Sequence, residues 1–577
     1  MSDSRRTRRT LAGLVLAAVL AGCTGVPVTG PVVYHTPPPE RVAPDVLIAP
    51  LPPTDGADPA LIVDGFLHAM SVYQPDYAIA RLYLTESANA AWRPLEGVQI
   101  YADGWPPTLA EDNVLLSAPL VGKLNERGEY APASSGQRVR QDFKLIRDGQ
   151  GQWRITNPPE GLLISRYLFA SGYVGVDLHH CDPSGTMLIP EPIWVPAGAE
   201  QHSRVLAAQL AGPSVWLAPL AMDVPALRLE AVSVTQGTAV VRVSGADGLS
   251  PQQRQAALLG LIATATRLSG VSQVELLSGG VAWTLPGHAG TRFTARDVAD
   301  VNPGSAGPPG SLVAVREGRV QTASVQDPAG GATVAPGVRD PRSAAVSARL
   351  DLVAAVVDDG ETLVTSAFEG EDVTEVRAGV GLLRPQFSRD ELWTADASGV
   401  SSFQVFTDDG PTAVSVPNPS EEAAPHPPAG ALVAFSLSPE GDRLAVAVAG
   451  ATGAEIGLLR VGRSDGPEPK VTLDGWRPLV LSSAEATTVI DLGWSTQTEL
   501  LVLVADDQGS TSVVRASQDG AVSAEIGPSA TVRFAELAVS PQHTALLRSE
   551  AGLIYRYDAD FSWPLWLTGV QAISLVQ

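Results

Sequence analysis

The run His179-His180-Cys181-Asp182 places four potential metal ligands side by side in the sequence. Imidazole, thiolate and carboxylate groups are the side chains that hold zinc in proteins. Neighbouring residues of a strand point to opposite faces, however, so these four side chains cannot all reach one ion. We therefore predict no metal site and no bound cofactor, and we expect the run to be the end of a structural strand.

Sequence motifs of catalysis do not stand out either. We find no H-E-x-x-H zinc motif and no P-loop, and we predict no nucleophile elbow. The 8 histidines are scattered, so a Ser-His-Asp triad would need tertiary coincidence. Asp358-Asp359-Gly360 and Asp408-Asp409-Gly410 are typical of hairpin turns rather than of calcium loops. We predict no catalytic residue, although 62 acidic residues leave a glycosidase-like carboxylate pair open.

Cys23 is the residue with the clearest chemistry. It follows four arginines at positions 5, 6, 8 and 9 and an apolar run at 11–20 that is too short to span a bilayer. Leu20, Ala21 and Gly22 before this cysteine resemble the lipobox of bacterial lipoproteins, where a signal peptidase cuts and the cysteine thiol is diacylated. We predict a signal peptide over 1–22 and lipidation at Cys23, which would anchor the protein on the extracytoplasmic face of the cell membrane. An ordinary secretory signal with a chance cysteine is the alternative.

Cys181 would then be a lone thiol. Cys23 and Cys181 are the two cysteines of the chain, so neither a disulfide framework nor a CxxC redox pair can form. The net charge of −23 argues against a nucleic-acid partner, because such proteins need a basic face. The length of 577 residues predicts three to four domains.

Composition and spacing divide the mature chain into a tether and three folded units. Residues 23–57 are rich in proline and predict an extended spacer. Residues 58–165 predict a small α+β domain, because Asp58 and Pro59 can begin a helix and strand patterns around Phe143 and Ile155 follow.

The second unit, 166–287, predicts helices on one face of a small mixed sheet. We expect strands at 167–178 and 187–195, and helices at 204–210 and 251–268. Gln236-Gly237 lies between two apolar runs and predicts a hairpin.

The third unit, 288–577, contains a repeat in which an apolar residue and a serine precede a polar turn and a short apolar strand. Intervals of roughly 40 to 57 residues between such strand units are the signature of a β-propeller. We predict five or six blades, the sixth formed around 311–320 and closed by the C-terminal strand. The copies end in Ser347, Ser388, Ser438, Ser495 and Ser540.

The order of these segments resembles the LpqB family of actinobacterial lipoproteins, whose second domain is GerM-like. The resemblance covers essentially the whole chain. It is carried by 66–67, 80–85 and Trp92, and by 188–191, 210–213, 241–244 and the helix from Pro251. It implies a non-catalytic accessory protein that contacts the extracellular domain of an MtrB-type sensor histidine kinase. Through that kinase it would modulate MtrA-type two-component signalling, cell division and cell-envelope homeostasis.

Two function hypotheses therefore remain open. The first is a membrane-anchored regulator of a sensor kinase. The second is an envelope protein that contacts the cell wall and binds or hydrolyses glycan, which predicts a polar, carboxylate-lined pocket at the propeller mouth.

Overall fold

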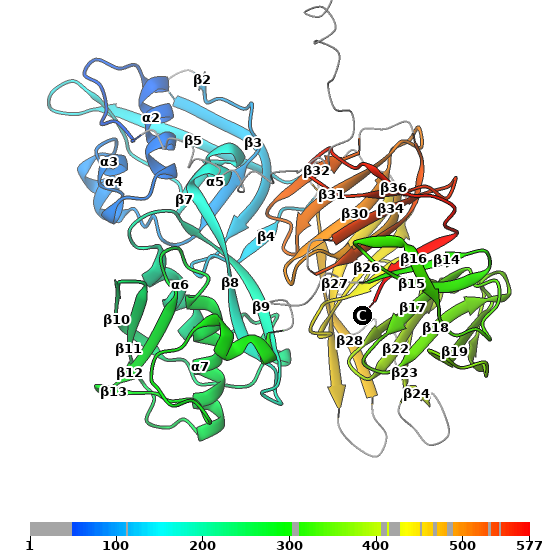
Figure 1. Cartoon of the computed structure of the whole chain (residues 1–577). Coiled ribbons are helices and arrows are strands. Elements are labelled where there is room, and N and C mark those ends of the chain that lie inside the picture. Colours follow the sequence, from blue (N-terminus) through cyan, green and yellow to red (C-terminus); the bar gives the residue numbers. More distant parts are fainter. Residues whose placement is uncertain are drawn as a thin grey trace, which may run out of the picture. The chain divides into compact units, whose positions relative to one another are not determined.

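The computed structural model describes residues 49–576 except 111–112, 135, 303–310, 406–411, 415–426, 451–452, 465–469, 482–487, 529–531 and 542–543. The predicted lipidation residue Cys23 and the predicted recognition residues Leu20, Ala21 and Gly22 lie outside the described part. So do most of the predicted tether and Asp408-Asp409-Gly410. Figure 1 shows the described elements. Among them, no helix is both long and apolar enough to cross a membrane.

The first domain begins with a capped helix. Asp58 accepts a hydrogen bond from the Leu61 N–H, and Pro59 is the first helical residue, as predicted. Asp76 and Tyr77 then adopt a left-handed backbone, which separates the short helical turn at 75–77 from the short helix at 78–81. The helical segments are α2 (Pro59–Ser71), η1 (Pro75–Tyr77), α3 (Ala78–Arg81), α4 (Glu86–Ala91) and α5 (Arg166–Gly172).

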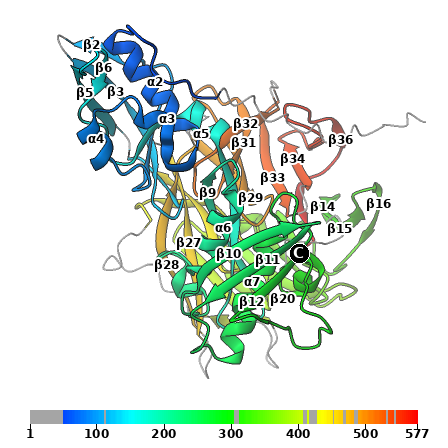
Figure 2. The ribbon, with the colours of Figure 1, turned by 90° about the vertical axis from the view of Figure 1, so that its left-hand side faces the viewer.

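A curved sheet in the order β6-β5-β3-β1-β7 forms the rest of this domain, with β2 and β4 paired to β3. Alternate residues of β3 and β5 are buried, and Phe143 of β5 meets Phe66 of α2 at 6.3 Å between ring centres. The helices therefore cover one face of the sheet (Figure 2). The strands are β1 (Val98–Tyr101), β2 (Thr108–Ala110), β3 (Asn113–Leu124), β4 (Tyr130–Pro132), β5 (Arg138–Arg147), β6 (Trp153–Ile155) and β7 (Leu162–Ser165).

The second domain combines a long hairpin with a mixed sheet. The hairpin pairs β8 (Tyr173–Cys181) with β9 (Leu188–Pro196), and the sheet has the order β10-β11-β12-β13 with β11 and β12 parallel. The long helix α7 begins in a capping box at Ser250. The other elements are α6 (Gln201–Leu210), η2 (Ala218–Leu220), β10 (Arg228–Thr235), β11 (Thr238–Ser244), α7 (Pro251–Ala265), β12 (Gln273–Ser278), β13 (Val281–Ala282) and η3 (Ala295–Val301).

The predicted hairpin turn is present between β10 and β11. Gln236 and Gly237 have φ angles of 49° and 78°, so both central residues are left-handed, as a type I′ turn requires. Gly260 in α7 allows the helix to approach β8 closely. A Cβ atom at that position would lie 2.2 Å from the His179 carbonyl oxygen.

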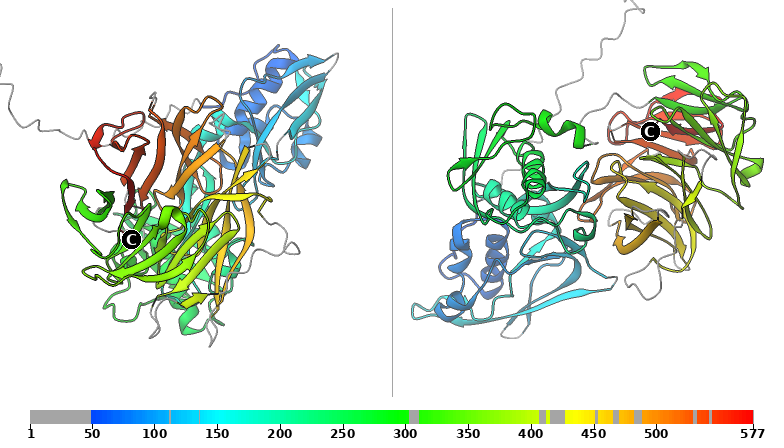
Figure 3. Two further views of the ribbon diagram at one scale, coloured as in Figure 1. Left: turned by 90° about the vertical axis from the view of Figure 1, so that its right-hand side faces the viewer. Right: turned by 90° about the horizontal axis from the view of Figure 1, so that it is seen from below.

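From residue 311 on, the described chain forms six four-stranded sheets, the blades of a propeller (Figure 3). Blade 1 contains β14 to β16 and β37, and blades 2 to 6 contain four consecutive strands each. The strands are β14 (Leu312–Arg316), β15 (Arg319–Ser324), β16 (Asp327–Thr333), β17 (Ser343–Ser347), β18 (Leu352–Val357), β19 (Thr362–Ala367), β20 (Thr374–Ala378), β21 (Gln386–Ser388), β22 (Glu391–Asp396), β23 (Gly399–Gln404), β24 (Thr412–Val414), β25 (Ala431–Leu437), β26 (Arg443–Gly450), β27 (Gly453–Ser464), β28 (Lys470–Leu479), β29 (Thr488–Trp494), β30 (Glu499–Ala505), β31 (Thr511–Ser517), β32 (Ser523–Gly527), β33 (Phe534–Ser540), β34 (Thr544–Ser549), β35 (Ile554–Arg556), β36 (Leu565–Leu567) and β37 (Ala572–Leu575).

The predicted fold class is confirmed, with six blades. β37 pairs with β14, so the C-terminal strand closes the ring as predicted. The five repeat copies mark the ends of β17, β21, β25, β29 and β33, each the first strand of its blade. Asp358-Asp359-Gly360 is the short turn η4 between β18 and β19, as predicted.

One strand prediction was wrong. The segment 167–178 was expected to be a single strand, but its first part belongs to the helix α5. The Ser165 hydroxyl accepts a hydrogen bond from the Leu168 N–H and starts that helix. Phe169 of α5 and Tyr173 at the start of β8 pack in the core of the first domain.

Candidate binding cleft and the interface between the domains

The run His179-His180-Cys181-Asp182 lies at the end of β8, and its four side chains have four different surroundings. Nδ1 of His179 lies 3.1 Å from the Thr264 hydroxyl, and its Nε2 contacts Arg267. Burial and the Arg267 charge hold the pKa of His179 well below its usual value. His179 is therefore a neutral core residue across the physiological range.

The other three members of the run are also engaged. His180 Nε2 lies 3.4 Å from the Glu191 carboxylate. Burial raises the pKa of the Cys181 thiol to about 12. The Asp182 carboxylate accepts hydrogen bonds from the Thr186 and Met187 N–H groups at 2.8 and 2.9 Å. No cluster of three metal-binding side chains occurs within the part of the chain that the structure describes.

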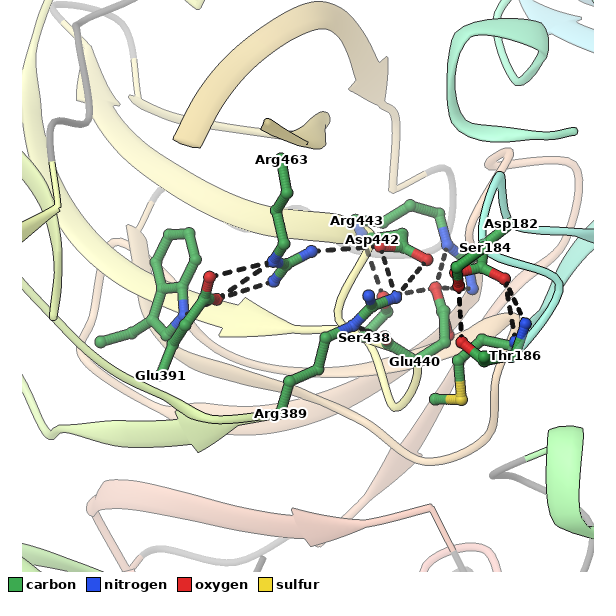
Figure 4. A network of polar contacts seen from close by, with 12 residues as sticks. Asp182, Ser184, Thr186, Arg389, Glu391, Ser438, Glu440, Asp442, Arg443 and Arg463 are labelled. Atoms are coloured by element: carbon green, nitrogen blue, oxygen red, sulfur yellow. Dashed lines mark hydrogen bonds and ion pairs between the residues drawn. The ribbon is translucent and has the colours of Figure 1, made fainter. Parts of the chain in front are cut away.

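The turn of this hairpin lies against the propeller, where Arg443 makes the central contact (Figure 4). The Arg443 and Glu440 side chains are both fully buried, and their charged groups are 2.7 Å apart. Nη1 of Arg443 donates to the Pro190 carbonyl of β9 at 3.3 Å and to the Gln518 side chain. Nη2 donates to the Gln497 carbonyl at 2.9 Å. One guanidinium thus connects blade 4, blade 5 and the second domain.

A chain of charges extends from this point into the propeller (Figure 4). Arg389 donates to both oxygens of Asp442 at 2.8 Å. Arg463 bridges Asp442 and Glu391 at 3.1 and 2.9 Å. Burial raises the pKa of Asp442 to about 6, although the Arg389 charge opposes this rise.

Two further hydrogen bonds join the hairpin to blade 5. Nε1 of Trp194 donates to the Asp519 carboxylate at 2.8 Å, and the Thr498 hydroxyl donates to Asp177 at 3.1 Å. Asp177 is half-buried, and desolvation of its carboxylate raises its pKa. The β8–β9 hairpin is therefore held by side chains of two neighbouring blades.

A cleft of about 820 Å³ lies where the three domains meet, and we call it the three-domain cleft. Trp216 of the second domain donates from Nε1 to the Gly475 carbonyl of the propeller at 2.5 Å. Arg477 of the propeller donates to the Tyr130 carbonyl of the first domain at 2.8 Å. Val215 lines the cleft and is 93% exposed. The lining residues lie at 123–125, 129–132, 191–192, 214–216, 460 and 474–478.

This lining has the composition of a binding surface. Aromatic and proline side chains lie beside charged groups, several of which already have partners, such as Arg460, which lies 2.6 Å from Asp474. Apolar concave surfaces with a few placed polar groups are typical of ligand and protein binding sites.

Arg384 connects strands of three different blades. Its guanidinium donates to the Ile573 carbonyl of β37, the Leu537 carbonyl of β33 and the Asp491 carboxylate of β29. Burial raises the pKa of Asp491, while Arg384 lowers it. The neighbouring Glu536 accepts from the Ile573 N–H and from Arg548. These paired carboxylates do not favour the glycan hydrolase hypothesis.

One sequence pattern needs a correction. Residues 462–466 read G-R-S-D-G and match the letters of a nucleophile elbow, which we did not expect in this chain. An elbow joins a strand to a helix. Ser464 instead ends β27, and β27 pairs with the next strand, β28, through Ser464 and Lys470.

Sequence reasoning missed both the cleft and Arg443. The repeat copy that ends in Ser438 is evident from the sequence, and the turn after this serine carries Glu440 and Asp442. The hydrogen bonds between the second domain and the propeller join residues 230 or more positions apart, such as Arg443 and Pro190. No local pattern signals such pairs.

The architecture defines a class of protein, a multidomain protein with an α+β domain, a GerM-like domain and a six-bladed propeller. Family models match the N-terminal domain of lipoprotein LpqB at 52–170, the sporulation and spore germination domain Germane at 177–282, and the LpqB beta-propeller domain at 310–572. The lipoprotein LpqB of Cutibacterium acnes is 30% identical over 97% of this chain and 97% of its own length. The lipoprotein LpqB of Thermobifida fusca is 26% identical over 90% and 91%.

The chain belongs to the LpqB family of lipoproteins. Among solved structures, TolB from Acinetobacter baumannii aligns with a TM-score of 0.34 and 10% identity, over 61% of this chain and 99% of that one.

Proposed function

We propose that this lipoprotein is a non-catalytic accessory of a membrane sensor histidine kinase of the MtrB type. Diacylated Cys23 anchors it on the extracytoplasmic face of the cell membrane, and the three-domain cleft binds the extracellular domain of the kinase. By this contact it modulates two-component signalling, cell division and envelope homeostasis.

The observation that supports it is the construction of the cleft. Each of the three domains contributes lining residues, and hydrogen bonds from Trp216 and Arg477 connect the domains around it. A surface fixed in this way is preorganised, so little ordering free energy opposes binding. Anchoring both proteins in one membrane raises their effective concentration, so a weak contact suffices.

Photo-crosslinking in intact cells tests this assignment. A photoreactive amino acid at Val215, on the cleft, is compared with one at Val281, which is 70% exposed on β13 of the same domain. We expect a histidine kinase among the adducts from position 215 and not from 281. In a Cys23→Ser background, which removes the anchor, we expect this adduct to be lost.

Two results would contradict the proposal. Equal kinase adducts from both positions would exclude the cleft as the docking site. Adducts only with wall glycan or its biosynthetic enzymes would favour the cell-wall hypothesis instead.

A further inference from the structure

The first domain has a row of cations on the sheet face that its helices leave uncovered. Arg138, Arg140 and Lys144 alternate with the buried Val139, Phe143 and Leu145 along β5, so they point away from the core. All three cationic residues are exposed. Arg154 of β6 pairs with Ile146 of β5 and therefore joins the same face. We call these four cations the basic row.

Aromatic and aliphatic side chains accompany the basic row. The Arg138 guanidinium lies 4.7 Å from the centre of the Trp105 ring. Trp105 is 44% exposed and Ile146 is 52% exposed. Tryptophan beside arginine is the combination that proteins place at the boundary between lipid headgroups and acyl chains.

The charge of this face differs from that of the whole chain. This face carries the four cations of the basic row, against the carboxylates of Asp142 and Asp148. Asp148 is already paired with Arg154 at 3.3 Å. The chain as a whole has a net charge of −23, so this concentration of cations is not a consequence of composition. Arg140 and Lys144 have no side-chain hydrogen bond or ion pair with the residues that the structure describes, so they add nothing evident to folding.

We propose that the basic row is a contact surface for the headgroups of anionic phospholipids, with Trp105 at its edge. A membrane is the occupant that fits both features, since the cations attract anionic headgroups and Trp105 and Ile146 can enter the interface. The first domain follows the predicted lipid anchor directly along the chain. Tethering to the bilayer allows a weak surface contact to be populated. The contact is independent of the kinase and the three-domain cleft.

Vesicle co-sedimentation with the unacylated chain from residue 24 tests the proposal. Its described residues belong to a compact unit, Ala49–Gln577, that has its own cores. We expect it to bind vesicles of phosphatidylglycerol and phosphatidylcholine at low salt, but not vesicles of phosphatidylcholine alone. Binding should fall as salt screens the charges. Each neutralised cation should weaken partitioning about fivefold.

The matched variants are Arg140→Gln with Lys144→Gln, and Arg556→Gln as the control in the propeller, where Arg556 is exposed. The double variant should bind anionic vesicles about 25-fold more weakly, and the control should bind like the parent chain. Quenching of tryptophan fluorescence by brominated anionic lipid should decrease in Trp105→Phe.

Other outcomes would overturn the proposal. Equal binding of the double variant and the control would exclude the basic row. Equal binding to neutral vesicles would exclude headgroup charge as the cause. If inorganic phosphate or glycerol phosphate at millimolar concentration abolished vesicle binding at constant ionic strength, the surface would be a site for free phosphate esters.

Discussion

Replacing Arg443 with methionine should loosen the contact between the propeller and the second domain without unfolding either. The Arg443 side chain is fully buried, and it neutralises Glu440, which is fully buried too. Oε2 of Glu440 has no hydrogen-bond partner among the described residues, so this carboxylate depends on Arg443 for its stabilisation. Removing one member of a buried ion pair typically destabilises by about 3 to 5 kcal/mol.

Local hydrogen exchange is the suitable assay, because a multidomain chain does not unfold in two states. The reporters are the amides of the turn between β25 and β26, where the Ser438 N–H donates to the Arg443 carbonyl at 2.9 Å. A loss of about 3 to 5 kcal/mol corresponds to roughly a hundred- to several-thousand-fold faster exchange. Arg556→Met in the same propeller is the control, because Arg556 is exposed.

The paired variant separates charge from packing. Arg443→Met together with Glu440→Gln removes both charges, so most of the protection should return. Unchanged exchange in Arg443→Met would refute the assignment of this contact. A double variant no better than the single one would show that the hydrogen bonds to Pro190 and Gln497, rather than the buried charge, carry the stability.

Three further predictions concern single residues. Cys181 should not react with a thiol reagent at pH 8 in the native chain carrying Cys23→Ser, because burial raises the pKa of this thiol to about 12. It should react fully once the chain is denatured. Rapid labelling of the native chain would contradict this prediction. Gly260→Ala should lower the melting temperature of the second domain despite alanine's higher helix propensity, because the new Cβ would lie 2.2 Å from the His179 carbonyl oxygen. The control Gly248→Ala should leave the melting temperature unchanged, because its new Cβ would have no atom within 4 Å. The folded-state pKa of Asp442, about 6, lies above its unfolded value of about 4. The contribution of Asp442 to stability is therefore fully present below about pH 4 and is lost as pH rises through 6. Asp442→Asn should lack this component of the pH dependence, and a pH profile identical to that of the parent chain would contradict the assignment.

Local elements could be predicted from the sequence because their signals are local. Asp58 and Pro59 specify a helix start by a side-chain acceptor and a fixed φ, whatever the helix later contacts. Gln236-Gly237 likewise specifies a two-residue turn by backbone conformation alone. The propeller repeat could be recognised in the sequence because every copy lies at the same structural position, the end of a blade's first strand.

The errors came from segments where two structures share one pattern. The apolar run after Ser165 is short, so its pattern is compatible with either a strand or a helix. The hydrogen bond from the Leu168 N–H to the Ser165 hydroxyl favours the helix. The two candidate binding surfaces also differ in whether a local sequence pattern reveals them. The basic row was present in the sequence as alternation along β5, whereas the three-domain cleft exists only after residues such as Tyr130 and Arg477 meet.

The propeller's repeat also explains why the second domain docks where it does. The turns after Ser438 and Ser495 occupy the same position in blades 4 and 5, so the ring places them side by side. One supplies Arg443 and the other supplies Gln497 and Thr498, and all three act at the domain interface. Neither turn alone spans the hairpin. A fold built from equivalent turns can therefore acquire an interface by substitutions at two of them, while the strands that form the ring stay unchanged.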